Sequence, residues 1–149
     1  MPNPFLPLLD EAFEKKSWHG PNLRGSIRGL SAEETLWRPA PNRHNIWEVA
    51  VHCAYWKYAV RRKLTGMKRG SFTLSGSNWF PRTGPPDAAA WKRDVALLAA
   101  EHKELRRVVA ALKAPKPAQL FLIRGVAAHD LYHAGQIQLL KRLKAKPRA

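Results

Sequence analysis

Two histidines in the C-terminal third of the chain have the spacing of metal ligands. His129 and His133 are four residues apart, so on a helix both imidazoles leave the same face and can bind one ion. The segment after His133 contains no His, Cys, Asp or Glu, and Asp130 stands where the motif of the zinc proteases has Glu. The pair therefore disfavours a zinc protease and requires a third donor from an earlier segment.

His52 is the best candidate for that third donor. It lies six residues into a predicted helix, at the border of the apolar stripe, from which a side chain can reach a neighbouring helix. The alternative is that all three are ordinary packed histidines. Buried imidazoles need polar partners, however, and Leu would pack better at such positions, which favours a metal. His102, at a core position of another helix, is either a fourth ligand or an ordinary packed residue.

Such a site has a defined chemistry. Three neutral imidazoles leave a divalent ion its full charge and at least one open position for water or substrate. An ion in that state lowers the pKa of a bound water or thiol. Three imidazoles suit Zn²⁺, Ni²⁺, Fe²⁺ and Cu²⁺, and we favour Zn²⁺ or Ni²⁺ as the cofactor.

Four further side chains are candidates to line the pocket of this site: Glu48, Trp56, Trp79 and Gln136. Glu48 lies one turn before His52 and could act as a base or support a ligand, but its role in a helix cap already explains it. Gln136 shares the helix face of the histidine pair. No catalytic residue is assigned beyond these candidates.

Two neighbours of the histidines are assigned other roles. Asp130 points about 100° away from the histidine pair and is expected at the surface or behind the ligands. Cys53 is adjacent to His52 but lies nearer the centre of the apolar stripe. A packed, inert thiol is therefore expected there rather than a nucleophile.

The elements that must hold these residues are helices almost throughout. Apolar spacings of three and four residues predict four long helices, over about 4–29 with an interruption, 46–65, 88–113 and 118–143. Asn45 and Glu48 form a capping-box pattern that starts the second of them, and Gly66 ends it. The last helix is apolar on its other faces too, so it is expected to be the most buried.

A long segment, 67–86, separates the second and third helices and is rich in Gly, Ser and Pro. A loop of that length in a small domain is more often a lid or a binding loop than a tether. The sequence therefore predicts an all-α fold, a four-helix bundle with one long crossover loop, in a single domain over 1–149.

Composition narrows the class of protein. With 45% hydrophobic residues and six Trp in 149 residues, the chain can bury a core, which excludes a disordered polycation. A single cysteine excludes an internal disulfide. No apolar run is long enough for a membrane span, and the first residues lack the pattern of a signal peptide, so a cytoplasmic protein is expected.

The motifs together resemble those of the DinB-like (DinB/YfiT) superfamily of metal-binding four-helix bundles. The resemblance rests on the segments 18–21, 43–48 leading to His52 and Trp56, 78–79 and 129–137. In that family three histidines, one from the second helix and two from the fourth, hold a divalent metal, and His52, His129 and His133 stand in those places. The resemblance also implies homodimers and, for some members, transfer chemistry that depends on a low-molecular-weight thiol.

Our first functional hypothesis is a metal-dependent enzyme, either a thiol S-transferase or a hydrolase that activates water. The alternative is a non-enzymatic protein, either a basic nucleic-acid-binding protein or a structural dimer with a vestigial metal site. The net charge is +15, with basic clusters at 61–63, 68–69 and 141–148. No known DNA-binding or RNA-binding motif accompanies them, which disfavours specific nucleic-acid binding. We expect instead a positive rim near the C-terminal helix that favours an anionic thiol substrate.

Overall fold

The computed structural model describes residues 3–145, so the last residues of the basic segment 141–148 lie outside the described part. Within residues 3–145 the chain forms helices and no strand, which confirms the all-α class. No helix in this range combines the length and the hydropathy that a transmembrane segment needs. The helices are α1 (Phe5–Phe13), α2 (Leu23–Ile27), α3 (Ala32–Leu36), α4 (Ile46–Thr65), α5 (Ala88–Ala111) and α6 (Pro117–Lys144).

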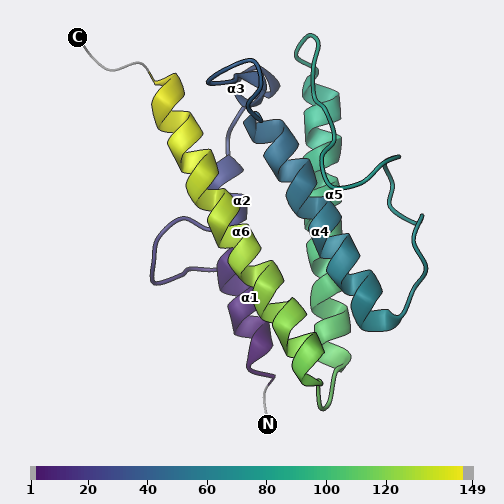
Figure 1. Cartoon of the computed structure of the whole chain (residues 1–149). Coiled ribbons are helices and arrows are strands. Elements are labelled where there is room, and N and C mark those ends of the chain that lie inside the picture. The colour runs from purple at the N-terminus through teal and green to yellow at the C-terminus, as the bar shows by residue number, and fades with distance from the viewer. Residues whose placement is uncertain (1–2, 146–149) are drawn as a thin grey trace.

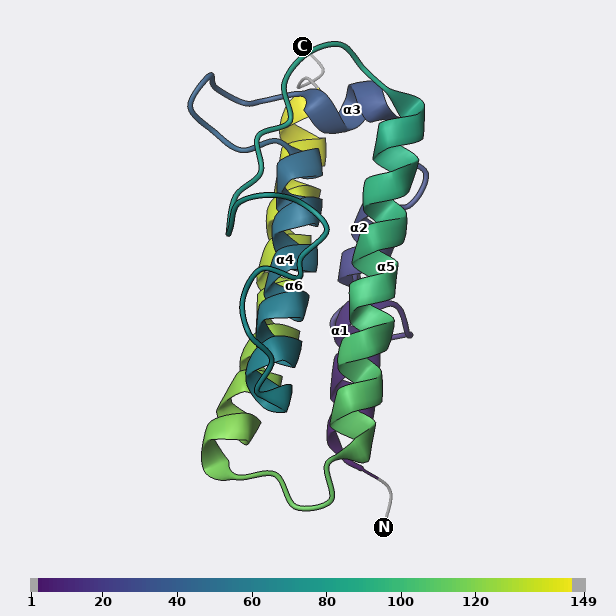
Figure 2. The same ribbon diagram turned by 90° about the vertical axis from the view of Figure 1, so that its right-hand side faces the viewer.

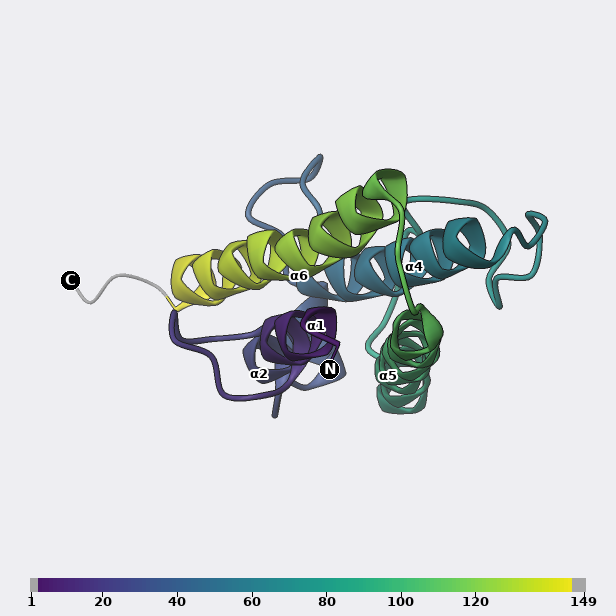
Figure 3. The same cartoon turned by 90° about the horizontal axis from the view of Figure 1, so that it is seen from below.

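The long helices lie alongside one another in two layers (Figure 1). Helix α4 packs against both α5 and α6, and α1 packs against α6 and α5. In the perpendicular view α4 and α6 form one layer, and α5 with α1 and α2 forms the other (Figure 2). The view from below shows α1 and α2 next to α6, with α5 below α4 (Figure 3). The contact between α4 and α6 is the one that positions the candidate site.

Local sequence signals account for the ends of α4. The side chain of Asn45 accepts a hydrogen bond from the Glu48 amide, and the Glu48 carboxylate accepts one from the Asn45 amide, which confirms the capping box. Gly66 ends the helix with a φ of 70°, a left-handed conformation that glycine adopts without steric cost. The three-dimensional position of Glu48 and His52 therefore follows from a helix whose start is fixed.

The region 4–29 contains two short helices, α1 and α2, joined by an irregular segment. Asn22 caps α2 by accepting a hydrogen bond from the Gly25 amide, and its own side-chain amide donates to the carbonyl of Lys15. Trp18, in the connecting segment, is almost wholly exposed. Asn22 therefore fixes the segment between α1 and α2 at both of its ends, while Trp18 does not pack in the core.

The expectation that α6 is the most buried helix is wrong. Fourteen of the 20 residues of α4 are buried, against seven of the 28 in α6. Helix α4 lies between α5 and α6, whereas one face of α6 remains uncovered and leaves Phe121 and Tyr132 exposed. The buried stripe of α6 centres on Asp130, which lies on the helix about 100° from His129.

A buried ion pair joins the two helices of the site. Lys57 of α4 is fully buried and donates to the carboxylate of Asp130, which is 1% exposed. Asp130 therefore does not lie at the surface. A signal for Lys57 was present, because the apolar stripe of α4 runs from Cys53 to Val60 and has a lysine at the core position between them.

His102 lies next to the buried pair of Lys57 and Asp130 and is not part of the group formed by His52, His129 and His133. Its Nδ1 lies 3.3 Å from the Nζ of Lys57, and its Nε2 lies 3.9 Å from a carboxylate oxygen of Asp10. Its ring stacks on Phe13 at 3.9 Å between centroids. Burial, with a contribution from Lys57, lowers the pKa of His102 to about 3. His102 is therefore a packed neutral histidine that contacts Lys57, Asp10 and Phe13. Of the two roles considered for it, that of an ordinary packed residue fits, and that of a fourth ligand does not.

The ion pair gives a first prediction. Replacing Lys57 with Met leaves the Asp130 carboxylate buried without a partner, so the free energy of unfolding should fall by about 3–5 kcal/mol. Replacing both residues, as Lys57→Met with Asp130→Leu, should recover much of that loss because no charge is left in the core. Urea denaturation of the two single variants and the double variant measures the coupling. Strictly additive losses would contradict it.

The lowered pKa of His102 gives a prediction of acid sensitivity. The unfolded chain takes up a proton at this histidine near pH 6.5 while the folded His102 stays neutral, so the contribution of His102 to stability is constant above that pH and falls below it. One such histidine costs about 1.4 kcal/mol for each pH unit below 6.5. Thermal melts between pH 7.5 and 4.5 should therefore show a shallower decline for His102→Gln than for the unchanged protein. Equal slopes would show that His102 does not contribute.

Candidate metal centre

Three histidines from two helices meet at one point. The Nε2 atom of His129 lies 3.1 Å from the Nε2 atom of His52 and 3.1 Å from the Nε2 atom of His133. His52 comes from α4, and the other two come from successive turns of α6. The structure thus brings together the three side chains that the sequence singled out, in a group that could hold a metal ion.

The outer nitrogens of two of these rings fix where their hydrogens lie. The Nδ1 of His52 is 2.8 Å from the carbonyl oxygen of Asn78, and the Nδ1 of His133 is 2.7 Å from Oε1 of Gln136. An oxygen of this kind only accepts, so both Nδ1 atoms carry the hydrogen and both Nε2 atoms present a lone pair. These two lone pairs face the Nε2 of His129, which has one hydrogen to offer at most. A divalent cation satisfies all three nitrogens, so the donor set fits a metal.

The surroundings keep the three rings neutral. Burial, opposed by the hydrogen bond to Asn78, lowers the pKa of His52 to about 4, and burial also lowers the pKa of His133. Burial and the neighbouring histidines lower the pKa of His129 to about 3. Neutral imidazole is the state that binds a metal. The trio is therefore in its ligating form at neutral pH.

The long loop between α4 and α5 reaches the trio through Trp79. The indole of Trp79 stacks on His52 at 3.8 Å between centroids and on His44 at 3.6 Å, with both imidazoles nearly parallel to it. Trp56 of α4 donates from Nε1 to the side chain of Asn78, which has a φ of 64°. The loop is thus held against the site by the two tryptophans and the asparagine, in agreement with a binding loop.

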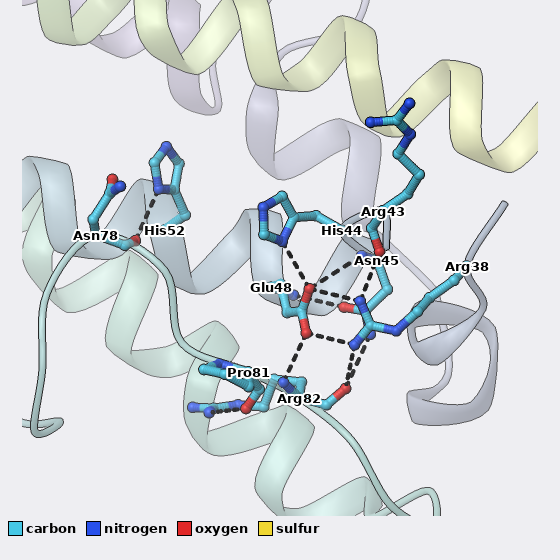
Figure 4. Close-up of polar contacts among 9 residues, drawn as sticks. All are labelled: Arg38, Arg43, His44, Asn45, Glu48, His52, Asn78, Pro81 and Arg82. Atoms are coloured by element: carbon cyan, nitrogen blue, oxygen red, sulfur yellow. Dashed lines mark hydrogen bonds and ion pairs between the residues drawn. The ribbon is translucent and has the colours of Figure 1, made fainter. Parts of the chain in front are cut away.

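Glu48 is anchored away from the trio. Its carboxylate accepts hydrogen bonds from both terminal nitrogens of Arg38, at 2.8 Å and 2.5 Å, and from the amide of Arg82 at 2.9 Å (Figure 4). Burial alone would raise the pKa of Glu48, but these hydrogen bonds, with that to His44, lower it to about 2. Glu48 stays ionised and has no capacity left to act as a base at the trio, which agrees with its role as a cap.

His44 is the residue of this site that the sequence analysis did not assign. Its Nδ1 lies 3.0 Å from the Glu48 carboxylate, and in Figure 4 its other ring nitrogen is directed away from Glu48. Within residues 3–145 that second nitrogen, Nε2, has no hydrogen-bond partner. A carboxylate that holds Nδ1–H leaves Nε2 free to accept a proton. The four-residue spacing between His44 and Glu48 was the available signal.

A pocket of about 860 Å³ opens over the trio. Its lining includes the candidates Trp56, Trp79 and Gln136, together with His44, and contains no Asp or Glu among the described residues. The part of its wall that α6 supplies is mainly apolar and includes Tyr132, Leu139, Leu140 and Leu143. None of the described basic residues of α6 lines the pocket, and the one cation in its described lining is Arg43, from the segment before α4.

Cys53 is fully buried, and burial raises the pKa of its thiol well above the usual range. Its sulfur lies within 4.8 Å of ligand atoms of His129 and Asp130 but not in the His52 group. The thiol is thus held protonated in the core. This agrees with the expectation of an inert cysteine and leaves the pocket without a protein nucleophile of this type.

The sequence model of the DinB superfamily matches residues 17–137. The chain belongs to the DinB superfamily. The matched range contains all the motifs on which the resemblance rested and all three histidines of the trio. No curated protein and no solved structure matches the chain. Membership in the superfamily and the geometry of the trio together support a metal-binding protein.

The geometry predicts how metal affinity depends on each neighbour. His133→Ala should abolish binding of one Zn²⁺ or Ni²⁺ per chain, because two imidazoles on different helices remain. Gln136→Leu should weaken binding about 10-fold to 100-fold, since it removes the acceptor that orients the His133 ring. Cys53→Ala serves as the control and should bind as the unchanged protein does. Calorimetric titration of metal-free protein, with elemental analysis, measures these effects, and metal retained by His133→Ala would contradict the assignment.

Proposed function

We propose that this member of the DinB superfamily is a metal-dependent enzyme that uses a low-molecular-weight thiol as nucleophile, of the S-transferase type. The observation that carries the proposal is that the neutral histidine trio opens onto a pocket of about 860 Å³. A purely structural metal site is closed by a fourth protein ligand. The arrangement of α1, α4, α5 and α6 also supports the four-helix bundle as the scaffold of this site.

The proposed nucleophile is a thiol that binds at the metal. A divalent ion held by the trio would lower the pKa of a thiol bound to it, so that a thiolate is available at neutral pH. The described residues that line the pocket include no Asp, Glu, Ser or Cys, so the nucleophile is a bound small molecule rather than one of these side chains. The apolar wall of α6, with Leu139 and Leu140, suits an apolar electrophile.

His44 supplies the proton acceptor in this proposal. Its Nε2 takes the proton of the thiol, and the ionised Glu48 stabilises the imidazolium through Nδ1. The sulfur then forms a bond to the electrophilic carbon, and the leaving group departs with the electron pair of the broken bond. Trp79 lies between His44 and His52 and keeps the two rings at fixed positions.

A homodimer stays a prediction, for which α6 offers a surface. Its uncovered face carries four exposed apolar side chains, and Gly125, Ala128 and Gly135 lie between them at spacings of three and four residues. Such a stripe suits close packing against a second copy of the chain. The exposed apolar residues are Phe121, Tyr132, Leu139 and Leu143.

The function is tested by turnover of 1-chloro-2,4-dinitrobenzene with a panel of small thiols and the metal-loaded protein. We expect His44→Phe to keep the stack on Trp79 and the metal content but to lower kcat/KM about 100-fold.

His19→Phe, a change at an exposed histidine, serves as the matched control and should retain full activity. Absence of turnover with every thiol above the level of the metal-free protein would contradict the proposal. Hydrolysis of an aryl ester without any thiol would show that water is the nucleophile instead.

A further inference from the structure

A second pocket lies on the other side of Trp56 and Asn78. It has a volume of about 790 Å³ and is formed by the C-terminal half of α4 and the loop residues 69–78. Figure 2 shows this loop running along α4. The two pockets have only Trp56 and Asn78 in common, so the second is a separate compartment beside the metal centre. We call it the basic groove.

The basic groove holds an uncompensated positive charge. Three of its lining residues are Arg62, Lys63 and Arg69, and none of the described residues that line it is Asp or Glu. Within residues 3–145 these three cations form no ion pair, whereas the adjacent Arg61 is bound to Glu101 at 3.0 Å. Like charges gathered in one concave surface repel each other, and a bound anion removes that repulsion.

Aromatic side chains build the floor of the basic groove. Phe72 of the loop packs at 5.4 Å from Tyr55 and 5.2 Å from Tyr58 of α4, measured between ring centroids. The amide and the hydroxyl of Ser71 both donate to the Tyr58 hydroxyl, at 3.2 Å and 3.3 Å. These contacts fasten the loop to the helix below the cations. The ring planes of Tyr55 and Phe72 are almost perpendicular, at 83°, so the groove presents the face of one ring and the edge of another beside its three cations.

We propose that the basic groove is a binding site for a small organic dianion that carries an aromatic part. The charged group, a phosphate monoester or a pair of carboxylates, lies between Arg62, Lys63 and Arg69. The aromatic part packs in the corner between the rings of Tyr55 and Phe72, stacked on one ring and in edge contact with the other. The site needs no metal, so it stands independently of the function proposed above.

Calorimetric titration of the metal-free full chain with four small probes, and with a single-stranded oligonucleotide for comparison, tests the site. The probes are 1-naphthyl phosphate, phthalate, inorganic phosphate and 1-naphthol. We expect one of the two aromatic dianions to bind with a stoichiometry of one, at least about 10-fold more tightly than inorganic phosphate or 1-naphthol, because only they combine both features. The tighter of the two identifies the charged group. Binding should weaken as sodium chloride is raised from 50 to 500 mM.

Matched variants separate the groove from the general positive charge of the protein. Lys63→Gln with Arg69→Gln should weaken binding at least about 10-fold. Lys103→Gln with Lys113→Gln removes the same charge from exposed positions outside the groove and should change affinity less than about twofold.

Three results would overturn the proposal: no saturable binding of either dianion up to 10 mM, equal losses in the two double variants, or tighter binding of a single-stranded oligonucleotide than of either dianion. The last would assign the groove to a nucleic-acid surface. Because the titration uses metal-free protein, its outcome does not depend on whether the metal centre is catalytic.

Discussion

Three imidazole nitrogens that face one another cannot all be satisfied by hydrogen bonds among themselves. The Nδ1 hydrogens of His52 and His133 are donated to Asn78 and Gln136, so two lone pairs are directed at His129. In a buried site such lone pairs are costly unless a cation or a proton binds to them, and burial disfavours the proton. The rest of the local structure holds the rings in this arrangement. Below them the pair of Lys57 and Asp130 ties α4 to α6.

A single carboxylate connects the start of α4 with the loop that covers the site. Glu48 completes the helix cap, binds Arg38, accepts from the amide of Arg82 and orients His44. The loop is therefore fixed at Arg82 and again at Asn78, with Trp79 between these points. A residue that the sequence explains by capping alone thus also positions His44 and the loop between α4 and α5. The buried carboxylate of Glu48 stays charged because all of these hydrogen bonds compensate for its loss of water.

What could be predicted from the sequence was local. The spacing of His129 and His133, the cap at Asn45 and the loop at 67–86 all depend on neighbours along the chain. The pair of Lys57 and Asp130 spans 73 residues, and only the packing of α4 against α6 brings it together. The burial of Asp130 could not be predicted locally, because the faces of α6 are nearly equally apolar and nothing in the sequence distinguishes the buried one. For the same reason, the apolar faces of α6 suggested that it would be the most buried helix, whereas α4 is.

The central claim is that the three histidines bind one metal ion through Nε2. X-ray absorption at the metal edge of the Zn²⁺-loaded or Ni²⁺-loaded protein tests it most directly. In buffer without any thiol, the account predicts three imidazole nitrogens at about 2.0–2.1 Å for Zn²⁺, completed by light atoms from solvent. A sulfur at about 2.3 Å under these conditions, or fewer than three imidazoles, would contradict it.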